Sequence, residues 1–204
     1  MKKVYTDPRK VILTDCDGVL LDWEYSFKVW MMHHGYNIVK DVEYKMNVMF
    51  GITKTKAREL IRTFSESAAI GFLPSLRDAV YYVRKLHERH GYVFHCLTSL
   101  SNDPAAQRLR QMNLDKVFGA GVFEEVVCAD TGADKHELLE PYRDSGCLWI
   151  EDKPENAVLG IEYGLKSVLM GHNHNADFSS EDIPRVWTWE QIYQMVTDST
   201  LLED

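Results

Sequence analysis

Short apolar runs that alternate with helix-like segments constrain the fold of this 204-residue chain more than any other feature. Gly91 and Gly164 stand where two of the helical patterns end. Alternating β and α units indicate an α/β fold, with a mostly parallel sheet that has helices on both faces. We expect strands at residues 10–15, 92–97, 125–128, 147–151 and 166–170, and helices at residues 76–90, 103–112, 135–141, 154–163 and 188–196.

The segment between the first expected strand and the 76–90 helix has no strong strand pattern. It contains three helix-like stretches, which are residues 24–34, 41–49 and 54–69. We therefore expect a core formed by residues 1–21 and 73–204, and a small helical insertion at residues 22–72.

Acidic residues follow the first apolar run in an arrangement that favours a binding site. Residues 10–14 lead into Asp15-Cys16-Asp17-Gly18. Because side chains two apart on a strand point the same way, Asp15 and Asp17 start from one face, and Gly18 lets the chain turn sharply behind them. Neighbouring carboxylates repel each other and need solvation or a cation. A solvated acidic turn is the simpler alternative, but a bound cation, with a metal ion as the first candidate, is the interpretation that we favour.

Two further apolar runs also end in polar residues, and a lysine opens a helix between them. These residues are Thr98, Ser99, Lys135, Glu151, Asp152 and, four residues further on, Asn156. Ligands bind at the carboxyl ends of parallel strands, near the point where strand order switches. We therefore expect these side chains to gather with Asp15 and Asp17 at one edge of the sheet.

This order of residues resembles the haloacid-dehalogenase-like (HAD) superfamily of phosphohydrolases. The match covers about residues 10–172 and includes the four motifs of the family in order. Each motif alone is weakly specific, but the ordered combination is specific. The resemblance implies a Rossmann-like parallel sheet, with residues 22–72 as a helical cap that closes over the site and excludes water.

The resemblance also implies catalytic roles. Asp15 would be the nucleophile that forms an aspartyl-phosphate, and Asp17 would be the general acid/base. Thr98, with Ser99, would hold phosphate oxygens. Lys135 would stabilise the charge of Asp15 and of the phosphate.

A metal ion is part of the same expectation. Oxygen ligands select a hard cation, so Mg²⁺ is the expected cofactor. By resemblance, Asp15 and Asp152 would bind it through their carboxylates, and Asp17 would bind it through its backbone carbonyl. Glu151 would bind the metal directly or contact one of its ligands. Asn156 would contact these ligands rather than the metal.

A closer similarity concerns the substrate. Residues 15–24 and 71–80 are similar to the opening and to the end of the cap in 5'(3')-deoxyribonucleotidases, although Glu151-Asp152 departs from the usual Asp-Asp of that subgroup. Trp23 and Phe27 are then candidates for an aromatic wall against a nucleobase. Their helical spacing is equally typical of the core of the cap.

Composition limits the partners of the chain. A net charge of −8 argues against a long nucleic acid. The basic run at residues 54–58 is interpreted as a solvated helix face, with contact to an anionic substrate as the alternative. We found no apolar run long enough for a membrane span and no signal-peptide core, so we expect a cytoplasmic protein. The sequence does not indicate an oligomeric state.

Together these features predict a Mg²⁺-dependent phosphohydrolase that acts on a small phosphomonoester, with a (deoxy)nucleoside 5'-monophosphate as one candidate. A sugar-phosphate phosphatase and a phosphomutase would use the same residues. A nucleic-acid 3'-phosphatase is disfavoured by the acidic charge. A non-enzymatic binding module would be expected to have lost Asp15, Asp17, Lys135 or Asp152, and all four are present.

Overall fold

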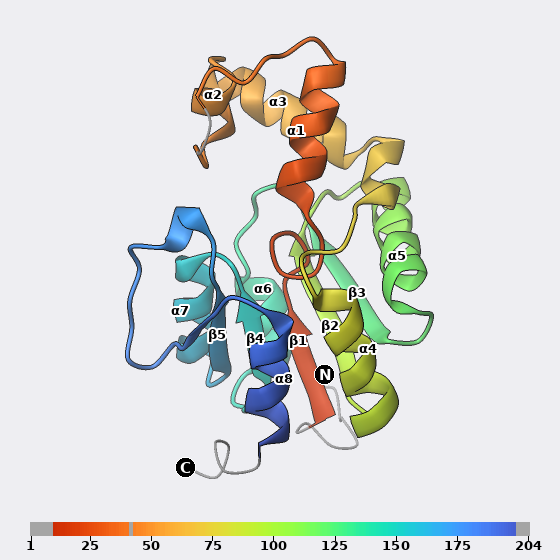
Figure 1. Cartoon of the computed structure of the whole chain (residues 1–204), viewed down its shortest axis with the longest axis vertical. Coiled ribbons are helices and arrows are strands. Elements are labelled where there is room, and N and C mark those ends of the chain that lie inside the picture. The colour runs from red at the N-terminus through yellow and green to blue at the C-terminus, as the bar shows by residue number, and fades with distance from the viewer. Residues whose placement is uncertain (1–9, 41–42, 199–204) are drawn as a thin grey trace.

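The computed structural model describes residues 10–40 and 43–198. Its centre is a parallel sheet with the strand order β3-β2-β1-β4-β5-β6 (Figure 1). The strands are β1 (Val11–Thr14), β2 (Val93–Ser99), β3 (Phe123–Ala129), β4 (Leu148–Glu151), β5 (Lys166–Met170) and β6 (Arg185–Val186). The predicted α/β, Rossmann-like fold is confirmed. The two-residue strand β6 was not predicted, because so short a run has no detectable alternation.

Helices cover both faces of the sheet. They are α4 (Ala79–His90), α5 (Pro104–Phe118), α6 (His136–Leu139), α7 (Pro154–Glu162) and α8 (Trp189–Thr197), with short 3₁₀ turns η3 (Glu140–Tyr142) and η4 (Asn173–Asn175). Ile12 packs with residues of α4, α5 and α8 in one buried cluster, whereas Leu13 packs with residues of α6 and α7 in another. Successive residues of β1 therefore face opposite layers, which is why all four of its residues are buried and the first three, Val11 to Leu13, are apolar.

The insertion that we expected at residues 22–72, called the cap segment below, is helical. It contains α1 (Trp23–His33), α2 (Met46–Met49), α3 (Lys54–Ser65) and the 3₁₀ turn η2 (Ala68–Phe72). The N-caps are formed by Asp22, which accepts from Tyr25 N, and by Thr53, which accepts from Lys56 N. In Figure 1 these helices lie beyond the carboxyl ends of the strands.

Two helix predictions in the cap segment were too long. The stretch 41–49 contains only the short α2, and residues 41–42 lie outside the described part. The stretch 54–69 ends at Ser65, because Ser67 begins the new turn η2 by accepting a hydrogen bond from Ala69 N. Apolar spacing continued past this break, so periodicity alone did not reveal it.

The chain enters and leaves the cap segment through two connections that lie side by side. Asp22 N donates to Pro74 O at 2.9 Å, and Leu76 N donates to Leu20 O at 2.8 Å. The side chain of Trp189 donates to Val19 O at 2.8 Å, so α8 also holds this crossing. The division into a core and a separate cap stays a prediction. Among the described helices, none combines the length and apolar character needed to cross a lipid bilayer.

Candidate active site

The carboxyl ends of β1, β2 and β4 bring the sequence-predicted residues together. Asp15 follows β1, Thr98 lies near the end of β2, and Glu151 ends β4 with Asp152 next to it. Carboxylate oxygens of Asp15, Glu151 and Asp152 all lie within 4.8 Å of one another. This grouping arises because β1 lies between β2 and β4, so that three strand ends open at one place.

Asp15 is held by a buried lysine. Lys135 Nζ donates to Asp15 Oδ1 at 2.9 Å and also to Leu97 O, and Cys16 N donates to the same Asp15 oxygen at 2.7 Å. Only 1% of Lys135 is exposed. Burial lowers the pKa of Lys135, but the negative charges of Asp15 and Glu151 outweigh burial and raise it above the usual value. The lysine therefore stays protonated beside the carboxylate.

The buried carboxylates of Glu151 and Asp152 have oxygen atoms with no hydrogen-bond donor. Glu151 Oε1 accepts from Lys153 N at 3.1 Å and from Asn156 Nδ2 at 3.3 Å. Glu151 Oε2 and Asp152 Oδ1, however, lack a partner in the described structure. Burial and the nearby charge of Asp15 raise the pKa of Glu151. Buried acceptors without donors are costly, and a hard divalent cation would satisfy them. The donor set therefore fits Mg²⁺, and Asn156 lies where predicted, on a carboxylate.

Gly18 makes room for Asp152. Its φ is +77°, and a Cβ atom at this position would lie 2.6 Å from Asp152 Oδ2. Any other residue would therefore be strained and would also collide with the carboxylate. The positive φ and the close approach of Asp152 thus both explain why this position of the motif is a glycine.

Asp17 has a partner that we did not predict, Arg110 of α5. Arg110 Nη1 donates to Asp17 Oδ1 at 2.7 Å and Nη2 donates to Oδ2 at 3.0 Å, while Nη1 also lies 2.9 Å from Cys16 Sγ. The arginine is fully buried. Burial raises the pKa of Asp17, and the positive charge of Arg110 opposes that rise. A two-pronged pair of this kind fixes the orientation of the carboxylate.

Asp152 is also supported by residues that we missed. His174 Nε2 lies 3.3 Å from Asp152 Oδ2, and Asn175 Nδ2 donates to Asp152 O at 2.7 Å. Burial would raise the pKa of Asp152, but the hydrogen bond and charge of His174 outweigh it and lower the pKa. His172 Nε2 lies 2.6 Å from Gly18 O, and His172 also lines the cavity described below. The histidine pair therefore supports the acidic loops.

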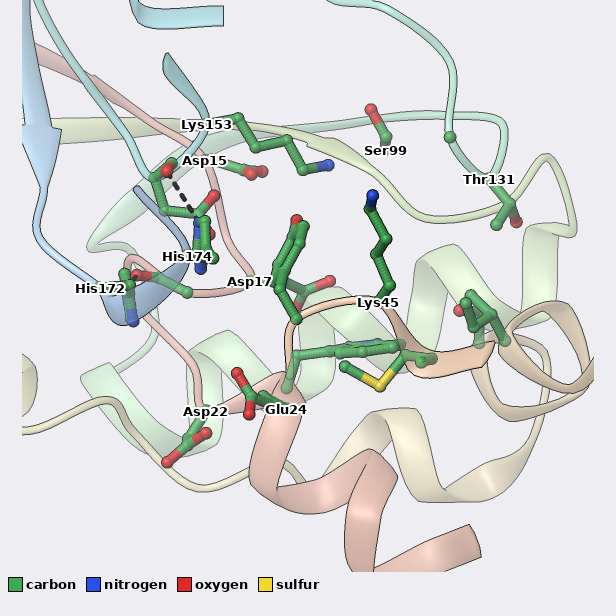
Figure 2. A pocket seen from close by; sticks show the side chains of 18 of the residues that line it. Asp15, Asp17, Asp22, Glu24, Lys45, Ser99, Thr131, Lys153, His172 and His174 are labelled. Atoms are coloured by element: carbon green, nitrogen blue, oxygen red, sulfur yellow. Dashed lines mark hydrogen bonds and ion pairs between the residues drawn. The ribbon is translucent and has the colours of Figure 1, made fainter. Parts of the chain in front are cut away.

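A cavity of about 1140 Å³ opens onto these groups. Asp15, Asp17, Thr98, Ser99 and Asp152 line it from the core. Residues from all three α-helical regions of the cap segment line it from the other side. Figure 2 shows acidic and basic side chains from both sides around this space. The cavity is large enough for a small organic phosphate.

The two phosphate-binding candidates differ in their contacts. Thr98 is buried and lines the cavity. Ser99 also lines it, but its hydroxyl donates to Ala133 O at 2.8 Å. The hydroxyl proton of Ser99 is therefore already used, whereas its hydroxyl oxygen can still accept a hydrogen bond.

The two residues proposed from the sequence for an aromatic wall have different surroundings. Trp23 lines the cavity. Phe27 is fully buried and does not line it, because it stacks on Trp23 with ring centroids 4.7 Å apart and packs edge-on against Phe50 and Phe64. For Phe27 the expectation of a cavity wall was wrong, and the alternative of a core position in the cap segment is correct.

No protein-family model matches the chain. A curated relative is an uncharacterized 32.4 kDa protein from the Gp30–rIII intergenic region of enterobacteria phage T4. It is 24% identical over 193 residues, which cover 90% of this chain and 68% of the relative.

Solved structures share the architecture at low sequence identity. A candidate phosphatase from Clostridium difficile has a TM-score of 0.63 at 15% identity, with 96% of this chain and 100% of that chain covered. A haloacid dehalogenase-like family hydrolase from Streptococcus pneumoniae has a TM-score of 0.59 at 13% identity, with 91% and 97% covered. CbbY from Rhodobacter sphaeroides, solved in complex with phosphate, has a TM-score of 0.58 at 16% identity, with 90% and 96% covered. The chain thus has the α/β fold shared by hydrolases of the haloacid dehalogenase-like superfamily.

Proposed function

We propose that this protein is a Mg²⁺-dependent phosphohydrolase that removes the phosphoryl group from a small phosphomonoester through an aspartyl-phosphate. The main support for this proposal is the environment of Asp15. The buried carboxylate of Asp15 is held by Lys135, lies in one cluster of carboxylates with Glu151 and Asp152, and lines a cavity. A fold shared with phosphatases and dehalogenases does not by itself choose the reaction.

The contacts of Asp15 suit a nucleophile. Oδ1 already accepts hydrogen bonds from Lys135 and from Cys16 N, and no described residue donates to Oδ2. Oδ2 would therefore attack phosphorus while Oδ1 stays fixed. Lys135 would neutralise charge on the transferring group, and Thr98 would bind one of its oxygens. Bound at Asp15, Glu151 and Asp152, the cation would neutralise further negative charge on the phosphate.

Asp17 would serve as the general acid and base. It lines the cavity two residues from Asp15, and its side chain is 23% exposed. It would protonate the leaving oxygen and later take a proton from the water that attacks the aspartyl-phosphate. Arg110 would position this carboxylate without contacting the substrate.

The finer proposal concerns the substrate. A nucleoside monophosphate is favoured by Trp23, which lines the cavity six residues past Asp17 in the chain. A sugar-phosphate phosphatase and a phosphomutase remain the second candidates, because both would need the same catalytic residues. The first would differ in the leaving group, and the second in the acceptor of the phosphoryl group.

Phosphate release from a panel of monophosphates tests the proposal. We expect release with Mg²⁺, loss in excess chelator, recovery on adding Mg²⁺ back and poor recovery with Ca²⁺. The last expectation follows because Ca²⁺ takes more ligands at longer distances and would misplace the phosphate. Full activity in excess chelator would rule out the role of Asp152 as a metal ligand.

A further inference from the structure

We infer that the substrate carries a second anionic group, most simply a second phosphate, and that Lys45, Lys54 and Arg58 of the cap segment bind it. The inference rests on the proposed function and changes its substrate class from a monophosphate to a small molecule with two phosphates, of which a nucleoside bisphosphate is one example. It starts from the charge of the cap segment. The whole chain has a net charge of −8, yet residues 22–72 contain seven Lys and Arg against six Asp and Glu.

The basic residues of the cap segment are concentrated at the cavity. Those that line it are Lys28, Lys45, Lys54, Arg58 and Arg62, whereas among the described acidic residues of the segment Asp22 and Glu24 line it. Basic residues gathered on one side of a cavity create a local positive potential on that side. Such a potential attracts and holds anions.

Two of these five cations already have partners. Lys28 pairs with Glu24 at 2.6 Å, and Arg62 pairs with Asp130 of the core at 3.0 Å. The side chains of Lys45, Lys54 and Arg58 form no ion pair or hydrogen bond with any residue in the ranges 10–40 and 43–198. These three are therefore available to a ligand.

Helix α3 contains both kinds of basic residue, those that line the cavity without a partner and one that is paired outside it. Lys54 and Arg58 are four residues apart, about 6 Å along the axis, and so lie on one face. Like charges at this spacing destabilise a helix unless a counter-charge is present. Lys56, by contrast, does not line the cavity and pairs with Glu59 at 2.8 Å. We predicted a solvated helix face for this run. Lys54 and Arg58 are exposed, and both also line the cavity.

The phosphate that reacts does not need these cations. Lys135 and the expected Mg²⁺ would meet it at Asp15, and Lys153 also lines the cavity from the core. Figure 2 shows Lys153 reaching into the space from the core and Lys45 reaching into it from the cap side. A substrate with one phosphate and an otherwise neutral body would leave the cap cations without counter-charge. A second phosphate would provide that charge.

Matched substrate pairs test this inference. We would compare kcat/KM for a nucleoside 5'-monophosphate with that for its 3',5'-bisphosphate, and for glucose 6-phosphate with that for glucose 1,6-bisphosphate. In at least one pair the bisphosphate should be preferred by about tenfold or more, the effect of one charge-assisted hydrogen bond. The preference should shrink as salt is added, because exposed charges are screened.

Two variants locate the effect. Lys54→Gln combined with Arg58→Gln should reduce the preference for the bisphosphate to about threefold or less, since both contacts are lost. Lys56→Gln, on the same helix but outside the cavity, should leave the preference unchanged. Circular dichroism of both variants would check that α3 is intact.

The outcomes separate this inference from the proposed function. Hydrolysis of the monophosphates with no preference for either bisphosphate would overturn the inference alone. Faster hydrolysis of a 3'-phosphorylated oligonucleotide than of both bisphosphates would also overturn it, in favour of a nucleic-acid end. If no compound is hydrolysed, the proposed function fails, and calorimetry with the same pairs still decides whether the second phosphate strengthens binding.

Discussion

The core and cap sides of the cavity hold their charged residues in opposite ways. On the core side, Lys135 is 1% exposed and Asp15 is 5% exposed, and the two are paired. On the cap side, Lys54 and Arg58 are exposed and have no partner among the residues that the structure describes. The charged side chains of the core side are therefore held in place before a ligand binds, whereas those of the cap side would gain their counter-charge from the ligand.

This difference separates chemistry from selection. Preorganised, buried charges stabilise a transition state because they need not reorient during the reaction. Exposed lysines and arginines on a helical segment reorient easily and can adapt to the remote part of a ligand. We therefore expect changes in the core to reduce turnover of every substrate, and changes in the cap segment to alter the order of preference among substrates.

The largest effect should come from Asp15→Asn. The amide cannot attack phosphorus, so turnover of every monophosphate should fall by at least about a hundredfold. Its oxygen can still accept from Lys135 and from Cys16 N, so the fold should remain. Phosphate release and circular dichroism measure the two expectations. Retention of more than about a hundredth of the activity would remove Asp15 as the nucleophile.

Arg110→Met should have the next largest effect and sharpens the comparison on the core side. Loss of the guanidinium leaves Asp17 without its partner, so kcat should fall by about tenfold or more for all substrates. The free energy of unfolding should drop by about 3 kcal/mol, as expected when one member of a buried pair is removed. Denaturant unfolding and steady-state kinetics measure both.

Arg108→Met is the matched control, because Arg108 is exposed on the same helix. Adding Asp17→Asn to Arg110→Met should recover part of the lost stability, since no charge is then left unpaired. If Arg110→Met and Arg108→Met behave alike, Arg110 has no positioning role.

Trp23→Ala should have the smallest effect and probes the cap side. If Trp23 stacks on a base, kcat/KM should fall by roughly fivefold, or about 1 kcal/mol, for a deoxynucleoside monophosphate and should hardly change for a sugar phosphate. Trp30→Ala, a change within the aromatic packing of the same helix, is the control. An equal loss on both substrates would mean that Trp23 only packs in the cap segment.

The sequence predicted the core side better than the cap side. Asp15, Thr98 and Asp152 follow local strand patterns, and the parallel sheet then brings them together whatever the loops do. Arg110 could not be paired with Asp17 in advance, because 93 residues separate them and only the fold joins them. Its one signal was a charged residue four positions from both Ala106 and Leu114 on a buried face of α5.

Other differences have similar causes. Helix α5 continues to Phe118, past the predicted end at residue 112, and stops before Gly119. His174 and Asn175 reach Asp152 from a loop after β5, and contacts between distant loops leave no periodic signal in a sequence. Phe27 and Trp23 share a helical stripe, and only tertiary packing separates the buried ring from the one at the cavity.

The covalent intermediate tests the central claim most directly. Wild-type protein with Mg²⁺ would be mixed with a hydrolysed substrate labelled in its phosphoryl group, quenched in acid within a single turnover, digested and analysed by mass spectrometry. The account predicts one phosphoryl group on the peptide that contains Asp15, a larger labelled fraction in Asp17→Asn because hydrolysis of the intermediate is slowed, and none in Asp15→Asn. Labelling of a different residue, or turnover with no labelled protein in either the wild type or Asp17→Asn, would contradict it.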